Sequence, residues 1–571
     1  MLPPMRPMAP EPAPLGGARR AARGAAPRAA LWAGSGALAG LAALVGARPG
    51  SLDDAFVVLV HARHFAATGR FAPGPEGPPV DGFTSIFDVL LKALPLALGA
   101  PDALRAAGWV GIGGLVLAAA ALALLARGLA RPAGSSAGAP ALAPWGWCAA
   151  LAAATTPGLA EGTSYALETP LYALLLAASA WTVVAVRPRL ALACAAVAPL
   201  VRPEGLVLGP AAWWLAARAG ACSRRATLRG ALLLAGVYAA TSAWRWWVFG
   251  APLPNSFYAK SSDSRWLELL DGLGYLWAAA LRPDGAATVV AFAMVLGAAR
   301  THAAARDLAR LAFLAAGVVA VSGGDSYTGS RLALPAGLFA WLTVAAALPV
   351  LARPGGTAGA RFTLAAVGSV AGLAACSALW PALRAPHTAV RAWLSGPLGL
   401  ESFADEARVV AALEQGIENA RGALPGAEGP LLVAHRHAQR YAWFARELAL
   451  FDLTGLTDRQ IARLPAEGPV SFGRDALDAA VARRVAVIHL DHLFARPELW
   501  AGRAVAEVLT PPAAARYLGA PWPAAERVAL LADAYVTASL PGLYGGYSGV
   551  NVLVRRDLAG AFAAAGFVLG D

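Results

Sequence analysis

Two adjacent carboxylates, Asp53 and Asp54, are the residues of this sequence best suited to chemistry. They follow the first long apolar segment directly and precede a loop rich in Gly and Pro. Charged groups at the mouth of a bundle of apolar helices are energetically costly, so their presence there indicates a function. A carboxylate in a partly dry site is a candidate general base, because loss of water raises its pKa toward the working pH. The alternative is an ordinary helix N-cap.

Four further polar stretches lie between apolar runs and carry groups that suit sugar hydroxyls or phosphate oxygens. Arginine binds phosphate through its forked guanidinium, and Asn, Tyr and Lys supply hydrogen-bond donors. Each stretch also has a structural explanation, as an acid at a helix N-terminus, an ion pair between helices or a plain turn. The residues of interest are Glu168 in Glu161–Pro170, Arg202 and Glu204 in Val201–Gly205, Asn255, Tyr258 and Lys260 in Pro252–Lys260, and Asp325 and Arg331 in Ser322–Arg331.

The composition predicts a membrane protein that spans the bilayer many times and carries a soluble part. Of 571 residues, 58% are hydrophobic and 14% are charged, against about 25% charged in soluble chains. The net charge of +12 comes from arginines in short loops, which set orientation in a membrane. No basic patch interleaved with aromatic residues points to nucleic acid. The four cysteines have neither disulfide nor metal spacing, so no cofactor is indicated, although the acids could bind a divalent cation.

About eleven apolar segments approach the length that a membrane-spanning helix needs, roughly 17–25 residues. The short segment Phe87–Leu98 is expected to be re-entrant or to lie along the outer interface, with Lys92 reaching the lipid headgroups. The expected helices are Ala29–Val45, Ala107–Leu125, Leu142–Leu159, Pro170–Val186, Leu190–Leu200, Gly205–Ala217, Gly230–Phe249, Ala286–Ala299, Leu308–Val321, Leu332–Leu351 and Phe362–Leu383.

The distribution of arginines orients these segments. Counted along the chain, the even-numbered connections collect nearly all the short-loop arginines and are therefore expected in the cytosol. Residues 1–28, rich in Pro, Ala and Arg, are expected to form a disordered cytosolic tail. Residues 29–384 form the transmembrane domain, and its first external loop, residues 51–100, holds the two aspartates. All five polar stretches then lie on the side of the membrane away from the cytosol.

The remaining residues, 385–571, are expected to form a soluble extracytoplasmic α/β domain. Short apolar runs predict strands and longer amphipathic stretches predict helices. The paired histidines His435 and His437 do not make a metal motif by themselves. The expected strands are Leu431–Val433, Val485–Ile488 and Val550–Val554, and the expected helices are Asp405–Ala420 and Ala524–Tyr535.

The order of the polar motifs resembles the GT-C class of membrane glycosyltransferases, most closely the bacterial branch that includes the mycobacterial terminal arabinofuranosyltransferases. The resemblance covers Asp53 to about Pro335 and continues weakly through FDLTGLTD at Phe451–Asp458. No single motif is diagnostic, but their order is fairly specific. The motifs, in order, are DDAF, DGFTS, LETPLYALLL, RPEGLVL, PLPNSFYAK and GGDSYTGSRLALP.

The resemblance implies an inverting glycosyltransferase of the bacterial inner membrane. Such enzymes move a sugar from a polyprenyl-phosphate carrier to a glycan, lipid or protein acceptor outside the cytoplasm. Asp53 and Asp54 match the acidic motif that supplies the base, and the remaining motifs line the donor site. The implied substrate-binding residues are Arg63, Thr84, Glu168, Arg202, Glu204, Asn255, Tyr258, Lys260, Asp325 and Arg331.

Two alternatives belong to other classes of protein. A transporter or flippase of a lipid-linked glycan predicts internal repeats and charges near the bilayer midplane, whereas this sequence shows no clear repeat and places its charges at the outer rim. A non-catalytic membrane protein that binds envelope glycans would tolerate neutral replacements of Asp53 and Asp54. The sequence identifies neither the sugar that is transferred nor the acceptor.

Overall fold

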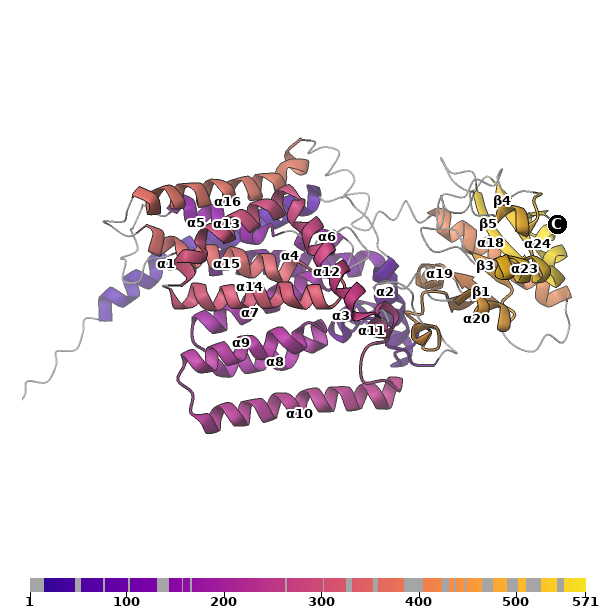
Figure 1. The fold of residues 1–571 in the computed structure, drawn as a ribbon, viewed down its shortest axis with the longest axis horizontal. Coiled ribbons are helices and arrows are strands. Elements are labelled where there is room, and N and C mark those ends of the chain that lie inside the picture. The colour runs from indigo at the N-terminus through magenta and orange to yellow at the C-terminus, as the bar shows by residue number, and fades with distance from the viewer. Residues whose placement is uncertain are drawn as a thin grey trace, which may run out of the picture.

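The computed structural model is mostly helical, with a bundle of helices lying side by side and a small sheet domain at one end (Figure 1). The residues that it describes are 15–46, 53–74, 78–100, 103–130, 143–156, 158–164, 167–261, 264–300, 302–324, 331–352, 358–384, 404–423, 431–435, 438–445, 448–464, 476–489, 502–509, 525–541 and 549–570.

Each of the eleven apolar segments overlaps a helix, and so does Phe87–Leu98, although Leu142–Leu159 runs past the end of its helix at Ala154. The first helix begins at Leu15, so residues 15–28 are helical and not the disordered tail expected for residues 1–28. In chain order the helices of the bundle are α1 (Leu15–Gly46), α2 (Asp53–Thr68), α3 (Ile86–Ala97), α4 (Ala103–Leu129), α5 (Ala143–Ala154), α6 (Leu159–Ser164), α7 (Thr169–Val184), α8 (Pro188–Val201), α9 (Gly205–Ala219), α10 (Arg224–Phe249), α11 (Asn255–Lys260), α12 (Arg265–Leu281), α13 (Pro283–Ala299), α14 (Ala303–Val321), α15 (Leu334–Leu351) and α16 (Ala358–Arg384).

Fewer helices than eleven have the length and composition of a membrane span. Within the described residues only α4, α15 and α16 meet both criteria, and α12 with α13 would add a fourth if this pair, bent by 96°, counts as one span. The count of eleven spans is therefore not supported. Several helices are too short, since α8 with 14 residues reaches only about 21 Å at 1.5 Å per residue, against about 30 Å of hydrocarbon. Helix α10 has 26 residues and is long enough, but it does not meet the criterion of composition.

Many of the buried residues in the core of the bundle are alanines. Helix α15 is buried along most of its length, with Trp341 and the run Ala345–Ala347 inside the bundle. Small side chains let helix backbones approach closely, so neighbouring helices pack with little space between them. Helix α10 lies at the edge of this core, where it packs against α8 and α9 (Figure 1).

The C-terminal domain contains one six-stranded mixed sheet of order β2-β1-β3-β5-β4-β6. Strands β2, β1 and β3 run parallel, and the others pair antiparallel. The strands expected from sequence are confirmed as β1, β3 and β5, and the helices as α18 and α23. The domain holds β1 (Leu432–His435), β2 (Ala449–Asp452), β3 (Val487–His489), β4 (Tyr535–Pro541), β5 (Gly549–Arg555) and β6 (Val568–Gly570), with α18 (Ala404–Ala423), α19 (Ala438–Phe444), η3 (Ile461–Arg463), α20 (Ala476–Ala482), α21 (Val505–Val508), α23 (Ala525–Ala534), η6 (Arg556–Leu558) and α24 (Ala559–Ala564).

The loop that follows β2 joins the sheet domain to the bundle. The side-chain amide of Asn255 donates to the carbonyls of Gly455 and Leu456 at 2.7 and 2.8 Å, and its backbone N–H donates to Asp81 O at 2.8 Å. Gly82 lies against the same loop, since a Cβ there would stand 2.7 Å from Leu456 O. This contact requires glycine at position 82.

A second contact joins α2 to α19. The guanidinium of Arg63 donates to the carbonyls of Ala442 and Trp443 at 2.7 and 2.8 Å and lies 4.8 Å above the Trp443 ring. These carbonyls belong to the last turn of α19, where a cation is favourable because the helix leaves its final carbonyls unpaired. The sheet domain is therefore held on both α2 and the start of α11.

We expect Asn255→Ala to loosen the junction, because two buried carbonyls lose their donor at a cost of about 1–3 kcal/mol. Hydrogen–deuterium exchange should become faster in residues 453–457. Asn419→Ala is the matched control, since the Asn419 amide donates only to Ala561 O within the sheet domain. Unchanged exchange in residues 453–457 of the Asn255 variant would contradict the assignment.

Candidate active site

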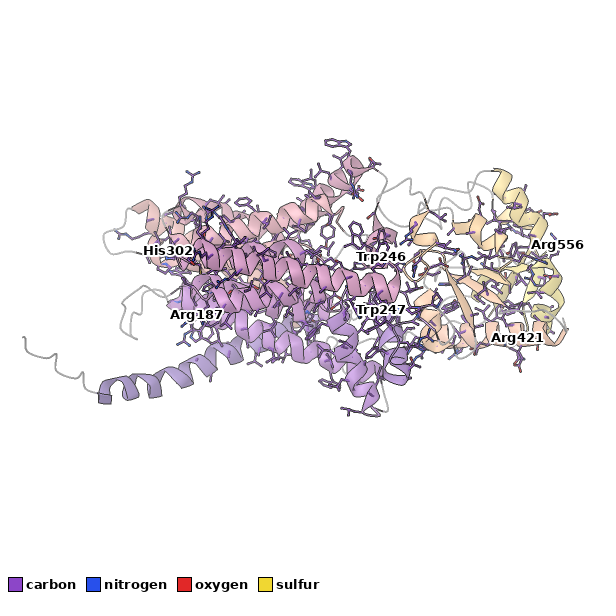
Figure 2. All side chains as sticks on the ribbon, turned by 90° about the horizontal axis from the view of Figure 1, so that it is seen from below. Arg187, Trp246, Trp247, His302, Arg421 and Arg556 are labelled. Atoms are coloured by element: carbon purple, nitrogen blue, oxygen red, sulfur yellow. The ribbon has the colours of Figure 1, made fainter. Side chains whose placement is uncertain are left out.

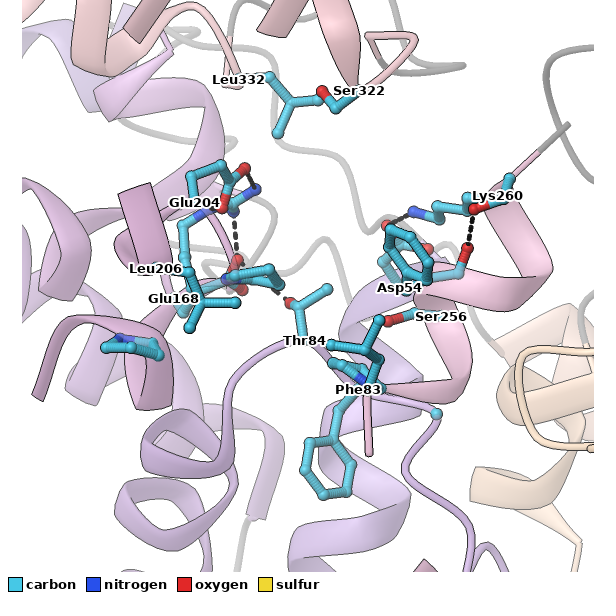
Figure 3. A pocket seen from close by; sticks show the side chains of 18 of the residues that line it. Asp54, Phe83, Thr84, Glu168, Glu204, Leu206, Ser256, Lys260, Ser322 and Leu332 are labelled. Carbon is cyan, nitrogen blue, oxygen red and sulfur yellow. Dashed lines mark hydrogen bonds and ion pairs between the residues drawn. The ribbon is translucent and has the colours of Figure 1, made fainter. Parts of the chain in front are cut away.

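A cavity of about 410 Å³ lies at the end of the bundle that faces the sheet domain (Figure 3). Its wall collects residues from α2, the loop before α3, the α8–α9 turn, α10, α11 and the segment before α15. Leu456 of the sheet domain also lines it. Segments far apart in the sequence thus meet at one space.

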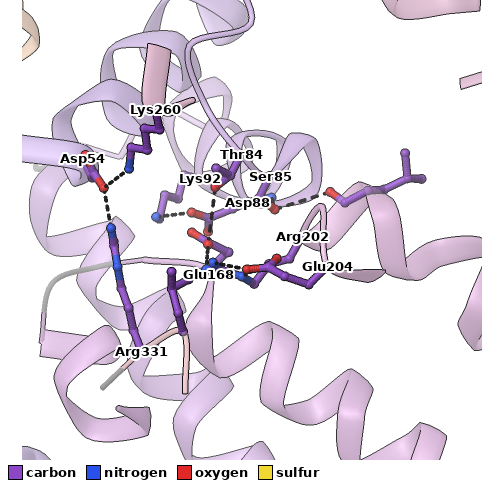
Figure 4. A network of polar contacts seen from close by, with 12 residues as sticks. Asp54, Thr84, Ser85, Asp88, Lys92, Glu168, Arg202, Glu204, Lys260 and Arg331 are labelled. Carbon is purple, nitrogen blue, oxygen red and sulfur yellow. Dashed lines mark hydrogen bonds and ion pairs between the residues drawn. The ribbon is translucent and has the colours of Figure 1, made fainter. Parts of the chain in front are cut away.

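Asp54 forms one side of this cavity and is paired with two cations. Its Oδ2 accepts a hydrogen bond from Arg331 Nη2 at 2.7 Å and another from Lys260 Nζ at 3.4 Å (Figure 4). Burial alone would raise the pKa of the Asp54 carboxyl, but Lys260 and Arg331 outweigh burial and hold that pKa below its ordinary value. In this arrangement Asp54 is an ionised carboxylate and a weak base.

Arg202 forms the opposite wall with two carboxylates. Its guanidinium donates twice to Glu204, at 3.1 and 2.9 Å, and once to Glu168 Oε1. Thr84 Oγ1 donates to that same Glu168 oxygen at 3.4 Å. A bidentate pair with a third charged bond fixes the geometry of Arg202 firmly. The carboxylate oxygens of Glu168 and Glu204 are hydrogen-bond acceptors suited to hydroxyl groups.

Local sequence explains why Arg202 points into the bundle. Pro203 disfavours helical backbone in the residue before it, and Arg202 is extended, with φ −151° and ψ 146°. Helix α8 therefore ends at Val201. Gly205 then starts α9 so close to α8 that a Cβ would meet the backbone of Ala198 at 2.3 Å. The motif Arg-Pro-Glu-Gly is thus a sharp helix–helix turn that presents Arg202 and Glu204.

Two more buried ion pairs support the loop before α3 and α3 itself. Arg245 of α10, which lines the cavity, donates to Asp81 Oδ2. Lys92 pairs with Asp88 at 2.6 Å. Burial raises the pKa of Asp81 to about 7 and that of Asp88 to about 6, with partial offset by Arg245 and Lys92. Lys92 is only 1% exposed, so the expectation that it reaches the headgroups is wrong, because Asp88 one turn earlier holds it inside.

The structure brings most of the sequence-derived candidates together, but not all. Asn255 and Arg63 hold the sheet domain, and Tyr258 lies under the Arg463 guanidinium at 5.4 Å; none of these three side chains lines the cavity. The Asp53 side chain and the whole of Asp325 lie outside the described residues. The candidates that do line the cavity are Asp54, Thr84, Glu168, Arg202, Glu204, Lys260 and Arg331.

Sequence reasoning missed Arg245 and Asp81 as a pair that supports the site. An arginine within the apolar stretch of α10 was the available signal, because a charge buried among apolar residues demands a partner. No group of three or more His, Cys, Asp or Glu side chains in the described ranges is placed to hold a metal ion.

No protein-family model, curated protein or solved structure matches this chain. The chemistry of the cavity is therefore argued from its own geometry. That geometry places two cations on one carboxylate, opposite a fixed arginine with acceptor oxygens around it.

The raised pKa of Asp81 predicts a pH dependence of stability. Because the folded-state pKa of about 7 lies above the ordinary value of 3.8, the stability from the protonated form is complete below about pH 4 and is lost as pH rises through 7. Asp81→Asn should remove this loss. Thermal unfolding in detergent from pH 5 to 8 should show the midpoint of the variant rising relative to the unmodified protein. A constant difference across that range would contradict the assignment.

Proposed function

We propose that this chain is a membrane glycosyltransferase of the GT-C type. It moves a sugar from a polyprenyl-phosphate carrier to a glycan, lipid or protein acceptor on the non-cytosolic side of a bacterial inner membrane. The observation that carries the proposal is the cavity in which Asp54, Lys260 and Arg331 meet beside an apolar wall.

The surface of the bundle supports a place in the membrane. Helix α10 exposes large apolar side chains, with Trp247 82% and Leu232 63% exposed, and contiguous apolar surface of this kind suits lipid. Trp246 and Trp247 lie toward the sheet domain and Arg187 at the opposite end of the bundle (Figure 2). Aromatic side chains favour the interface and arginines favour the cytosolic side. The sheet domain is then extracytoplasmic.

The cavity has separate features for the two parts of the donor. Lys260 and Arg331 supply positive charge for the phosphate. The wall toward α9 and α10 is apolar, with Leu206, Val207 and Tyr238, and Leu206 and Val207 are also partly exposed at the bundle surface. A polyprenyl chain entering from the membrane would lie along this wall while its phosphate reaches the cations.

The proposed sugar transfer uses the side chains of Asp54, Lys260 and Arg331 in one displacement. The acceptor hydroxyl attacks the anomeric carbon of the sugar, its proton passes to the Asp54 carboxylate, and the bond from the anomeric carbon to the phosphate oxygen breaks. The electron pair leaves with polyprenyl phosphate, whose growing charge Lys260 and Arg331 stabilise. A single displacement inverts the anomeric centre. The oxygens of Glu168 and Glu204 hold sugar hydroxyls.

We expect Asp54→Asn to lower the rate of transfer by about 10²–10⁴-fold, because the general base is lost. The assay follows release of polyprenyl phosphate and labelling of acceptor, with purified protein and radiolabelled polyprenyl-phosphate sugar. Asp307→Asn is the matched control, since Asp307 also accepts from two arginines, Arg218 and Arg310, away from the cavity. Full activity of Asp54→Asn would remove this residue from the reaction, and movement of intact lipid across the bilayer would indicate a transporter.

Val207→Trp should obstruct the lipid-binding wall. Activity should fall with a long polyprenyl donor and change little with a donor carrying a short chain. Val197→Trp on α8 is the control, because Val197 is similarly exposed but does not line the cavity. Equal loss with both donors would contradict the proposed path of the chain.

A further inference from the structure

The geometry points to a charge exchange at Asp54: the phosphate of the ligand takes Lys260 from this carboxylate, shares Arg331 with it, and so releases it to accept a proton. The phosphate carrier is the ligand of the proposed function, and the inference rests on that proposal for its identity. It adds an order of events, in which ligand binding itself prepares the base.

Three observations carry this inference. Lys260 and Arg331 both donate to the same oxygen, Asp54 Oδ2. All three side chains line the one cavity. The Lys260 contact is long, at 3.4 Å, and its side chain is 35% exposed, whereas the Arg331 side chain is 8% exposed. One cation is thus free to move on a flexible stem while the other is held in place.

A phosphate competes with the carboxylate for these cations. It offers more oxygens than the single one that Asp54 uses, and a guanidinium binds two phosphate oxygens at once. Its negative charge also increases as the bond to the sugar breaks, so its attraction for both cations is greatest in the transition state. Within the triad of Asp54, Lys260 and Arg331, two positive side chains share one carboxylate oxygen.

The exchange changes what Asp54 can do. Burial raises the pKa of this carboxyl, and the two cations are what keep it low. A phosphate that draws Lys260 away and shares Arg331 leaves the effect of burial less opposed and adds a neighbouring negative charge, and both favour protonation. Asp54 is then a competent base only when the carrier is bound, so the acceptor hydroxyl and water are not activated before it.

Arg202 does not take part in this exchange. Glu204 binds it through two hydrogen bonds and Glu168 through a third. A phosphate would have to break all three to recruit it, which is a much larger cost than the displacement of one carboxylate oxygen. The cations available to the ligand are therefore Lys260 and Arg331.

The test measures binding of polyprenyl phosphate without a sugar to purified protein in detergent. Asp54→Asn should bind it about fivefold tighter, because the variant no longer competes for the cations. Asp54→Glu keeps the charge and should stay close to the unmodified protein. Asp307→Asn should leave the affinity unchanged. Equal or weaker binding by Asp54→Asn overturns the inference.

A double-mutant cycle separates exchange from simple repulsion between Asp54 and the phosphate. Lys260→Gln should weaken binding about tenfold, and in that background the gain from Asp54→Asn should shrink, because one of the shared cations is absent. Repulsion alone would give the same gain in both backgrounds, and that result overturns the exchange. Unchanged affinity of Lys260→Gln by itself would do so too.

These measurements involve no sugar transfer, so they stand apart from the activity assay. If the protein transfers sugar but Asp54→Asn does not bind polyprenyl phosphate more tightly, the glycosyltransferase proposal stands and the exchange is rejected. If Asp54→Asn binds polyprenyl phosphate more tightly but the protein transfers no sugar, the cavity is a site for phosphate-bearing lipids and the transferase proposal is rejected.

Discussion

Pairing of buried charges is the constraint on which the bundle depends. Removing an ion from water costs several kcal/mol even after relaxation, so a charge inside an apolar bundle persists only with a partner. Asp81 is matched by Arg245, Asp88 by Lys92, and Arg202 by two glutamates. The Asp81–Arg245 pair ties the loop before α3 to α10, the Asp88–Lys92 pair lies within α3, and Arg202 joins the α8–α9 turn to the start of α7. The ion pairs thereby locate the cavity as well as line it.

The two walls of the cavity differ in how firmly their charges are held. On one side the guanidinium of Arg202 is fixed by both Glu168 and Glu204. On the other side Lys260 meets Asp54 through one long contact. Fixed acceptors suit recognition of hydroxyl groups, whereas a loosely held cation such as Lys260 can follow a charge that develops during a reaction. One site thus combines a rigid surface for a sugar with an adaptable one for a phosphate.

The sheet domain is part of this site through a single loop. The Asn255 amide holds the carbonyls of Gly455 and Leu456, and Leu456 itself lines the cavity. Gly82 lets the loop approach, because any side chain there would collide with Leu456 O. The same short segment that carries Lys260 at its end therefore carries the anchor of the sheet domain at its start. Movement of that domain would therefore shift α11 and with it Lys260.

The sequence by itself determined most of the long helices but not α2 or α12, three of the six strands and the polar segments that form the site. Periodicity, apolar runs and residues such as Pro203 act over a few positions, so they can be recognised from sequence. The sequence did not determine which groups these side chains contact. Asn255 and Lys260 belong to one motif, yet the first faces the sheet domain and the second faces Asp54. Only tertiary structure decided this, since the direction of a side chain depends on segments hundreds of residues away. The apolar segments also overstated the number of spans, because within the described residues few of the helices they form are both long and apolar enough to cross a membrane.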